Sequence, residues 1–239
     1  VSYSRRFDRI DLGVKLKELA EVLDLSTVHN VFDDGATGLT SRFGQLDGTF
    51  LAAVEHGAYG VAEKVFRQDQ KSILSKIEES KLSGRGGAHF PTGLKWRLAA
   101  QNEGPRYLVV NAEEGEPGVF KDRHLLEADP HRLIEGILIC CYAVGVEKTF
   151  VYINGQAHKG IESFMTALEQ AQNSGITGPK FLPEKMAVDI EVRAGAGGYV
   201  CGEESVILNS IEGERPVPRF KPPFATDEGL WGMPTVINN

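Results

Sequence analysis

The feature that most constrains the fold is an alternation of apolar runs and amphipathic segments that begins near residue 107. Three short runs have the composition of buried strands: "RYLVVN", "KTFVYING" and "MAVDIEV". Each is followed by a segment with apolar residues at helical spacing, of which the first two are 129–145 and 158–175 and the third leads into "SIEG" at 210–213. This strand–helix order predicts an α/β fold with a doubly wound parallel sheet.

Residues typical of helix ends define the bounds of the first predicted helix. Asp129 suits the N-cap of the first helix, Pro130 its first position and Gly145 its end. In the second helix one face is predicted to carry Ile161, Phe164, Met165 and Leu168.

The first eighty residues carry weaker patterns. Residues 12–23 repeat apolar positions at helical spacing, and residues 33–48 are typical of a loop. A clearer helix is predicted from residue 70, ended by Gly84, with a stripe formed by Ile73, Leu74, Ile77 and Leu82. We expect an N-terminal helical and loop region at 1–57 and an α/β domain at 58–239.

Directly after that helix the segment "GRGGAHFPTGLKW" (84–96) clusters glycines with an arginine, a histidine and a lysine. Glycine is costly in backbone entropy, so a cluster indicates positive φ or close approach of the backbone to a ligand. The plain alternative is a helix end followed by a turn.

Two unusual segments follow predicted strands: "NAEEGEPG" (111–118) and "AGAGGYVCGEE" (194–204). In open parallel sheets the ligand crevice lies outside the carboxyl ends of the strands. A glycine turn that enters a helix also exposes unpaired N–H groups that suit an anion. Together the two segments predict a nucleotide-like ligand that is held in part by Glu114, Glu116, Glu203 and Glu204. The alternative is that these carboxylates are simply solvated loop residues.

The composition excludes several classes of protein. A formal net charge of −7 argues against a nucleic-acid surface, and no apolar run is long enough for direct membrane insertion. Without a signal-type N-terminus we expect a cytoplasmic location. Cys140 and Cys141 are predicted to be core residues, and Cys201 has no nearby His or second Cys to make it a nucleophile. His89 is equally isolated, and no metal site is predicted in this chain.

Four motifs in series resemble one family: "GRGGAHFPTGLKW", "NAEEGEPGVFKDR", "YVCGEESVILNSIEG" and "KPPFATDEGLWGMPTVINN". They are similar to the FMN- and NADH-binding flavoprotein subunit of respiratory complex I (NADH:quinone oxidoreductase). The same module recurs as the diaphorase subunit of NAD-linked hydrogenases and formate dehydrogenases, and the sequence does not choose among these complexes. The resemblance implies a modified Rossmann-like parallel sheet with a glycine-rich FMN loop.

The resemblance also implies the function and the site. It predicts an FMN-dependent NADH dehydrogenase subunit in which hydride passes from NADH to FMN, so no side chain need act as a general base. The implied FMN-binding residues are Gly84, Arg85, Gly86, Gly87, Lys95, Asn111, Glu113, Glu114, Gly202, Glu203, Asn238 and Asn239. The implied NAD-binding residues are Phe90, Glu116, Glu204, Lys221 and Phe224; Lys95 and Glu116 are expected to orient the reactants.

Three positions depart from the family pattern. His89 stands where the family usually has glycine, Glu113 replaces an aspartate, and Leu98 replaces an aromatic residue. His89 and Leu98 bear on NADH affinity more than on FMN binding.

The family continues into a helical domain that carries a 4Fe–4S cluster, whereas this sequence stops at Asn239. We therefore expect a fragment or a shortened chain, with the cluster only on a domain that is absent here. The resemblance implies a thioredoxin-like iron–sulfur subunit as partner, on the cytoplasmic or matrix face of a membrane complex. One alternative is a degenerate copy that binds a partner without turning over NADH. Another is a subunit of a membrane ferredoxin:NAD oxidoreductase, against which "EGEPG" argues.

Overall fold

A computed structural model describes Phe50, residues 53–54, 56–183 and 186–239. The helix expected at 12–23 and the loop expected at 33–48 lie outside these residues, and the boundary expected at 57/58 stays a prediction. Across the described part of the chain, no helix is both long and apolar enough to cross a lipid bilayer.

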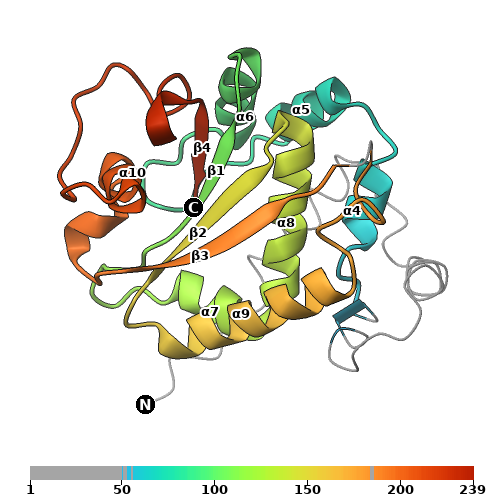
Figure 1. Cartoon of the computed structure of the whole chain (residues 1–239), viewed down its shortest axis with the longest axis horizontal. Helices are drawn as coiled ribbons and strands as arrows, with labels where there is room; N and C mark the ends of the chain where they lie inside the picture. Colours follow the sequence, from blue (N-terminus) through green and yellow to red (C-terminus); the bar gives the residue numbers. More distant parts are fainter. Residues whose placement is uncertain (1–49, 51–52, 55, 184–185) are drawn as a thin grey trace.

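Four parallel strands form the centre of the molecule (Figure 1). They are β1 (Tyr107–Ala112), β2 (Lys148–Asn154), β3 (Asp189–Gly195) and β4 (Thr235–Asn238), in the order β3-β2-β1-β4. The α/β fold and the first three strands were predicted correctly. The fourth was missed, because "TVIN" is a short run with no helical or turn signal of its own.

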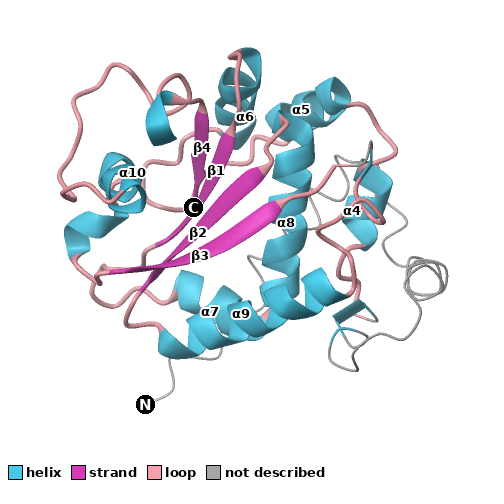
Figure 2. Ribbon diagram, viewed as in Figure 1, coloured by secondary structure: helices cyan, strands magenta, loops and turns pink. Residues whose placement is uncertain are grey.

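Helices cover the sheet on both faces (Figure 2). They are α4 (Gly60–Val65), α5 (Gln70–Glu79), α6 (Thr92–Gln101), α7 (Lys121–Ala128), α8 (Pro130–Val144), α9 (His158–Asn173) and α10 (Glu204–Glu212). Two short 3₁₀ helices accompany α10, namely η2 (Tyr199–Gly202) and η3 (Leu230–Gly232).

The alternation of side chains along the strands divides the core between these two faces. On β1, Leu108 and Val110 face the larger cluster, which contains residues of α4 to α9, while Val109 faces the smaller cluster formed with α10 and η3. Cys140 and Cys141 lie buried in the larger cluster, as the sequence predicted.

The strand order creates a switch point between β1 and β4. The chain runs from β1 to β2 and then to β3, and the helices that connect these strands lie on one face of the sheet. It then forms α10 on the opposite face and returns to add β4 on the other side of β1. Right-handed crossovers require this change of face when the direction of travel reverses. Ligands bind at such points in open α/β sheets.

Two local predictions about α5 were wrong. Helix α5 ends at Glu79, so Gly84 does not end it and Leu82 lies beyond it; Lys81 adopts the left-handed conformation at φ 55° instead. Asp129 and Gly145 flank α8 as predicted, but the Asp129 carboxylate accepts from Arg132 Nε rather than capping the helix.

On α9 the predicted apolar face is only partly buried. Phe164 and Leu168 lie in the core, but Met165 is 54% exposed. Met165 directly follows Phe164, and a helix turns about 100° per residue, so the two side chains cannot share one narrow face.

Candidate functional site

A cavity of about 690 Å³ opens at the switch point between the carboxyl ends of β1 and β4. Its walls come from the glycine loop before α6, from α6 itself, from the turn before α10 and from the segment 221–227. Of the predicted FMN residues it brings together Gly84, Gly86, Lys95, Asn111, Gly202, Glu203, Asn238 and Asn239. Of the predicted NAD residues it includes Phe90, Glu204, Lys221 and Phe224.

The glycine loop is a closed turn rather than a continuation of α5. Gly84 N donates to Phe90 O at 3.0 Å, and Ser83 and Pro91 form an isolated antiparallel bridge. Inside the loop Gly87 has φ 104°, a value that favours glycine. His89 has φ 50°, in the left-handed region that non-glycine residues enter at a cost. The loop thus presents backbone and an imidazole to the cavity.

Lys95 brings a positive charge into the cavity from α6. Its Nζ donates to Ile237 O at 2.8 Å, lies 3.9 Å from Glu204 Oε2 and sits 5.2 Å from the centroid of the Phe90 ring. Burial lowers the pKa of Lys95, although Glu204 opposes the shift. Lys95 is half-buried and, within the described residues, has one carboxylate oxygen within 4 Å, so its amine can still donate to an anionic or electron-rich partner.

Lys221 supplies a second amine from the segment after α10. Its Nζ donates to Glu203 Oε1 at 3.0 Å and to Glu204 Oε1. Burial works to lower the pKa of Lys221, but these two hydrogen bonds outweigh it and raise the pKa.

Glu203 serves α10 as well as the cavity. Its Oε2 accepts from Ser205 N at 2.8 Å and Val206 N at 3.0 Å, which makes it the N-cap. Burial opposes ionisation of Glu203, yet the bonds from Ser205 and Lys221 prevail and lower its pKa.

The asparagines join the strand ends to one another. Asn239 Nδ2 donates to Asn111 O at 3.0 Å, and Asn111 Nδ2 donates to Gly202 O at 2.9 Å. Asn238 Oδ1 accepts from Trp96 Nε1 at 3.0 Å. These contacts place amide groups of β1 and β4 along one side of the cavity.

Large apolar side chains face the same cavity and remain accessible. Phe90 is 42% exposed, Leu98 36% and Phe224 54%. Exposed apolar side chains in a concave site, beside amines and amides, are suited to a flat heteroaromatic ligand with a phosphate.

Five predicted site residues do not line the cavity: Arg85, Gly87, Glu113, Glu114 and Glu116. Glu114 and Glu116 line a separate, shallower hollow of about 400 Å³ beside α7. Glu114 Oε1 accepts from Asp122 N at 2.8 Å, and its Oε2 lies 3.3 Å from Arg123 Nε, so its carboxylate caps α7.

Sequence reasoning missed much of the wall formed by β4 and the segment before it. The residues concerned are Ala225, Thr226, Asp227, Thr235 and Ile237, and Thr92 of α6 was missed as well. The three β-branched residues "TVI" directly before the paired asparagines are the signal that could have indicated a strand there. His89 and Leu98, noted as departures from the family, both line the cavity.

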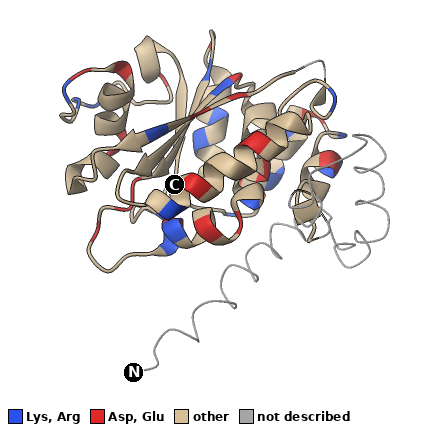
Figure 3. Cartoon of the chain, turned by 60° about the horizontal axis from the view of Figure 1, so that its bottom comes forward, with Lys and Arg blue, Asp and Glu red and all other residues tan. Residues whose placement is uncertain are grey.

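Within the described residues, no three His, Cys, Asp or Glu side chains gather in a way that could hold a metal ion. In Figure 3 acidic and basic residues are interspersed along the ribbon of the helices that come forward.

The comparisons with known proteins cover the part of the chain that forms the sheet and the cavity. The family model described as the Nuo51 FMN-binding domain matches residues 77–239. A subunit of the NADH-quinone oxidoreductase of Aquifex aeolicus (strain VF5) is 46% identical over 186 residues, which is 78% of this chain and 44% of that protein. The corresponding NADH-quinone oxidoreductase subunit of Rhizobium meliloti (strain 1021) is 44% identical over 196 residues, covering 81% of this chain and 47% of that protein.

A solved structure of an NAD+-reducing NiFe hydrogenase in the H2-reduced state is 38% identical with a TM-score of 0.66. It covers 74% of this chain and 31% of the hydrogenase chain. This chain therefore spans less than half the length of these relatives.

Proposed function

The chain belongs to the family of the Nuo51 FMN-binding domain, and on that premise we propose that it is the FMN- and NADH-binding module of an NADH-oxidising electron-transfer complex. The observation that carries this proposal is the cavity at the switch point, where amines, amides, glycine backbone and exposed aromatic rings face one space.

The residues present fit FMN. A volume of about 690 Å³ lies within the range of cofactor sites. Lys95 offers a cation to a phosphate or an electron-rich ring edge, and the amides of Asn111 and Asn239 offer hydrogen bonds at a ring edge. We assign the predicted FMN residues that line the cavity to the flavin. Arg85, Gly87, Glu113 and Glu114 stay predictions from the resemblance.

NADH is proposed to enter on the side of Phe90 and Phe224, with Glu204 and Lys221 at its polar groups. FMN, when bound, supplies the hydride acceptor, and the protein contributes orientation. Because the Lys221–Glu204 pair is already formed, these side chains need little rearrangement to receive a ribose.

We also propose the setting of this module. Relatives named as subunits support an electron-transfer partner, which we take to be a thioredoxin-like iron–sulfur subunit. The location that follows is cytoplasmic, or the cytoplasmic or matrix face of a membrane complex.

Reconstitution tests the proposal. The folded chain is mixed with FMN, desalted and measured for bound flavin, and we expect one FMN per chain. Gly86→Leu places a side chain in the cavity and should abolish retention. Gly136→Leu, at an exposed position of α8 where a Cβ meets open space, is the matched control and should retain flavin. Folded protein that never retains flavin would overturn the proposal.

A degenerate copy without turnover is the second candidate, favoured by His89 and Leu98 in the cavity wall. NADH-dependent reduction of ferricyanide by the flavin-loaded chain separates the two. Flavin retention without any reduction would favour the degenerate copy.

A further inference from the structure

One buried carboxyl near the cavity, that of Glu113, does not line it. Glu113 follows β1 and is 8% exposed, and its Oε1 accepts from Asn154 Nδ2 at 2.8 Å. Among the described residues its buried Oε2 has no hydrogen-bond partner. An ionised carboxylate can accept about four hydrogen bonds, so this site is poor for the charged form.

The elements around the carboxyl supply no compensating cation among the described residues. They present Tyr152 and Asn154 from β2, Gly195 from β3, and Cys201 and Gly202 from the η2 turn. The neighbouring Glu114 carboxylate turns away to cap α7, where it meets Arg123. Burial alone raises the pKa of Glu113 to about 7.

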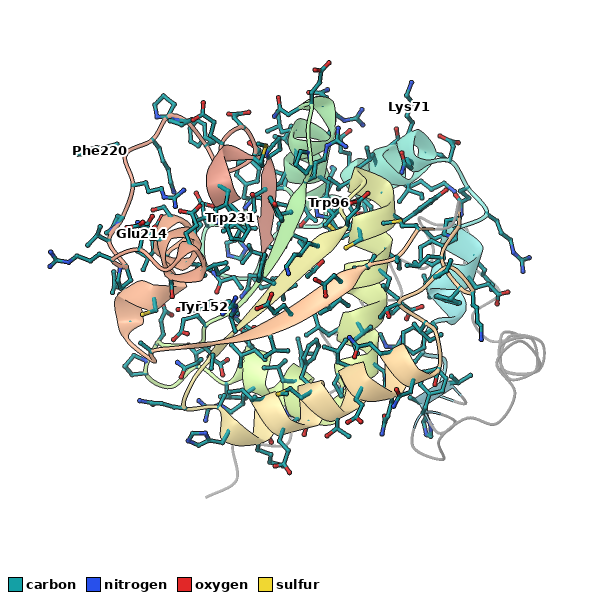
Figure 4. The ribbon with its side chains drawn as sticks, in the orientation of Figure 1. Lys71, Trp96, Tyr152, Glu214, Phe220 and Trp231 are labelled. Carbon is teal, nitrogen blue, oxygen red and sulfur yellow. The ribbon has the colours of Figure 1, made fainter. Side chains whose placement is uncertain are left out.

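The ends of β2 and β3 pack on this side chain. A Cβ on Gly195 would lie 2.3 Å from Glu113 Oε2 and 2.7 Å from Cε1 of Tyr152, so β3 approaches the carboxyl as closely as a glycine allows. Asn154 also donates to Glu114 O at 3.3 Å and accepts from Gln156 N at 2.9 Å. Figure 4 labels Tyr152 near the end of the sheet where these segments meet.

Glu113 also contacts two residues that line the cavity, Gly202 and Asn111. A Cβ on Gly202 would lie 3.3 Å from Glu113 O and 3.8 Å from its Cγ, and Gly202 O accepts from Asn111 Nδ2 at 2.9 Å. Glu113 N in turn donates to Asn111 Oδ1 at 3.2 Å. Asn111 and Gly202 both line the cavity, whereas Glu113 does not.

We propose that Glu113 is a positioning residue that holds this wall of the FMN cavity in its protonated form, and that ionisation of its carboxyl loosens the wall and weakens FMN binding. The proposal rests on the proposed function. A charged Oε2 must find water or a donor, and it can do so only by separating Glu113 from Gly195 and Gly202. The protonated acid avoids the cost of burying an unpaired charge.

The sign of the pH dependence follows. The carboxyl is protonated below about pH 7 and ionised above it. FMN affinity is therefore highest on the acid side and falls as pH rises through this value, by up to about tenfold per pH unit. FMN binding above this pH should take up protons, because the bound state favours the protonated acid.

The experiment measures the FMN dissociation constant of the full chain by flavin fluorescence from about pH 6 to about pH 9. Glu113→Gln, which mimics the protonated acid, should bind FMN as the wild type does at acid pH and lose the pH dependence near pH 7. The phosphate of FMN itself titrates near pH 6, so the difference between the two profiles is the quantity of interest. Glu147→Gln, at an exposed position just before β2, is the control and should keep the wild-type profile.

Infrared spectroscopy of the flavin-free chain provides an independent readout. A protonated carboxylic C=O band that titrates near pH 7 and is absent from Glu113→Gln supports the proposal. Its absence at pH 6, or superimposable FMN profiles of wild type and Glu113→Gln, overturns it. If neither the wild type nor Glu113→Gln binds FMN at any pH, both the proposed function and the positioning role of Glu113 are wrong. The carboxylic C=O band then still reports whether Glu113 is protonated.

Discussion

The cavity between β1 and β4 and the shallow hollow beside α7 both lie at the carboxyl edge of the sheet, yet they use their acidic residues differently. In the cavity, Glu203 and Glu204 keep oxygens that pair with Lys221 at the cavity wall. In the segment after β1, the Glu114 side chain is 3% exposed and caps α7, and Glu113 is buried against Asn154.

The two regions also differ in their apolar surface. The cavity exposes Phe90, Leu98 and Phe224 to one space, whereas the lining of the hollow is mostly polar and backbone groups together with Phe120, which is 60% exposed. The two rings and the leucine that face one cavity offer a flat ligand more surface to stack on than the hollow does. The difference teaches that a glycine-flanked acid at a strand end serves a ligand in one place and the fold in another.

The largest expected effect is on the cavity amine. Lys95→Ala removes the charge and the hydrogen bond to Ile237 O, so FMN binding should weaken roughly 100-fold, about 3 kcal/mol. Fluorescence titration measures this. Lys71→Ala, an exposed lysine of α5 labelled in Figure 4, should leave affinity unchanged. Equal affinities of the Lys95 variant and wild type would remove Lys95 from the flavin site.

The next test asks whether the acids of the hollow serve the fold. Glu114→Ala removes the cap of α7 and leaves two partly buried N–H groups unpaired, so the free energy of unfolding should fall by about 2 kcal/mol. Urea unfolding provides the measurement. The exposed neighbour gives the comparison: Glu116→Ala should change the free energy by less than about 0.5 kcal/mol. Similar losses in both variants would contradict the structural role of Glu114.

Coenzyme choice tests the acids of the cavity. The 2′-phosphate of NADPH should meet the Glu204 carboxylate, but Lys221 neutralises part of this charge, so the preference for NADH is about tenfold. Glu204→Gln should reduce it, as seen in flavin reduction at limiting coenzyme. Glu214→Gln, on the loop after α10 in Figure 4, should keep the preference. Equal rates with both coenzymes in the wild type would exclude this role of Glu204.

The smallest expected effect concerns the left-handed residues. His89→Gly and Lys81→Gly each relieve a positive φ and should raise the free energy of unfolding by no more than about 1 kcal/mol. Only His89 lines the cavity, so His89→Gly alone should change the KM for NADH. Thermal unfolding and NADH kinetics on the two variants decide this. A change in KM with Lys81→Gly would show that strain rather than the imidazole matters.

The local sequence pattern by itself determined most of the strands and helices of the sheet domain. Periodicity and composition predicted β1, β2, β3, α8, α9 and α10 but not α7, and Pro130 and Gly145 predicted the ends of α8 to the residue. These features depend on neighbours within a few positions along the chain, which a sequence displays directly. The burial of Cys140 and Cys141 follows from the same pattern.

Tertiary structure alone decided where the site lies and how its acids are used. β4 is a strand because Thr235 to Asn238 pair with β1, more than a hundred residues earlier, and that pairing makes the switch point. Glu113 and Glu114 are adjacent glutamates in one motif, but one meets Asn154 across the sheet and the other the first turn of α7. A carboxylate's role is set by the donors that surround it in space, and those donors come from parts of the chain that local pattern does not connect.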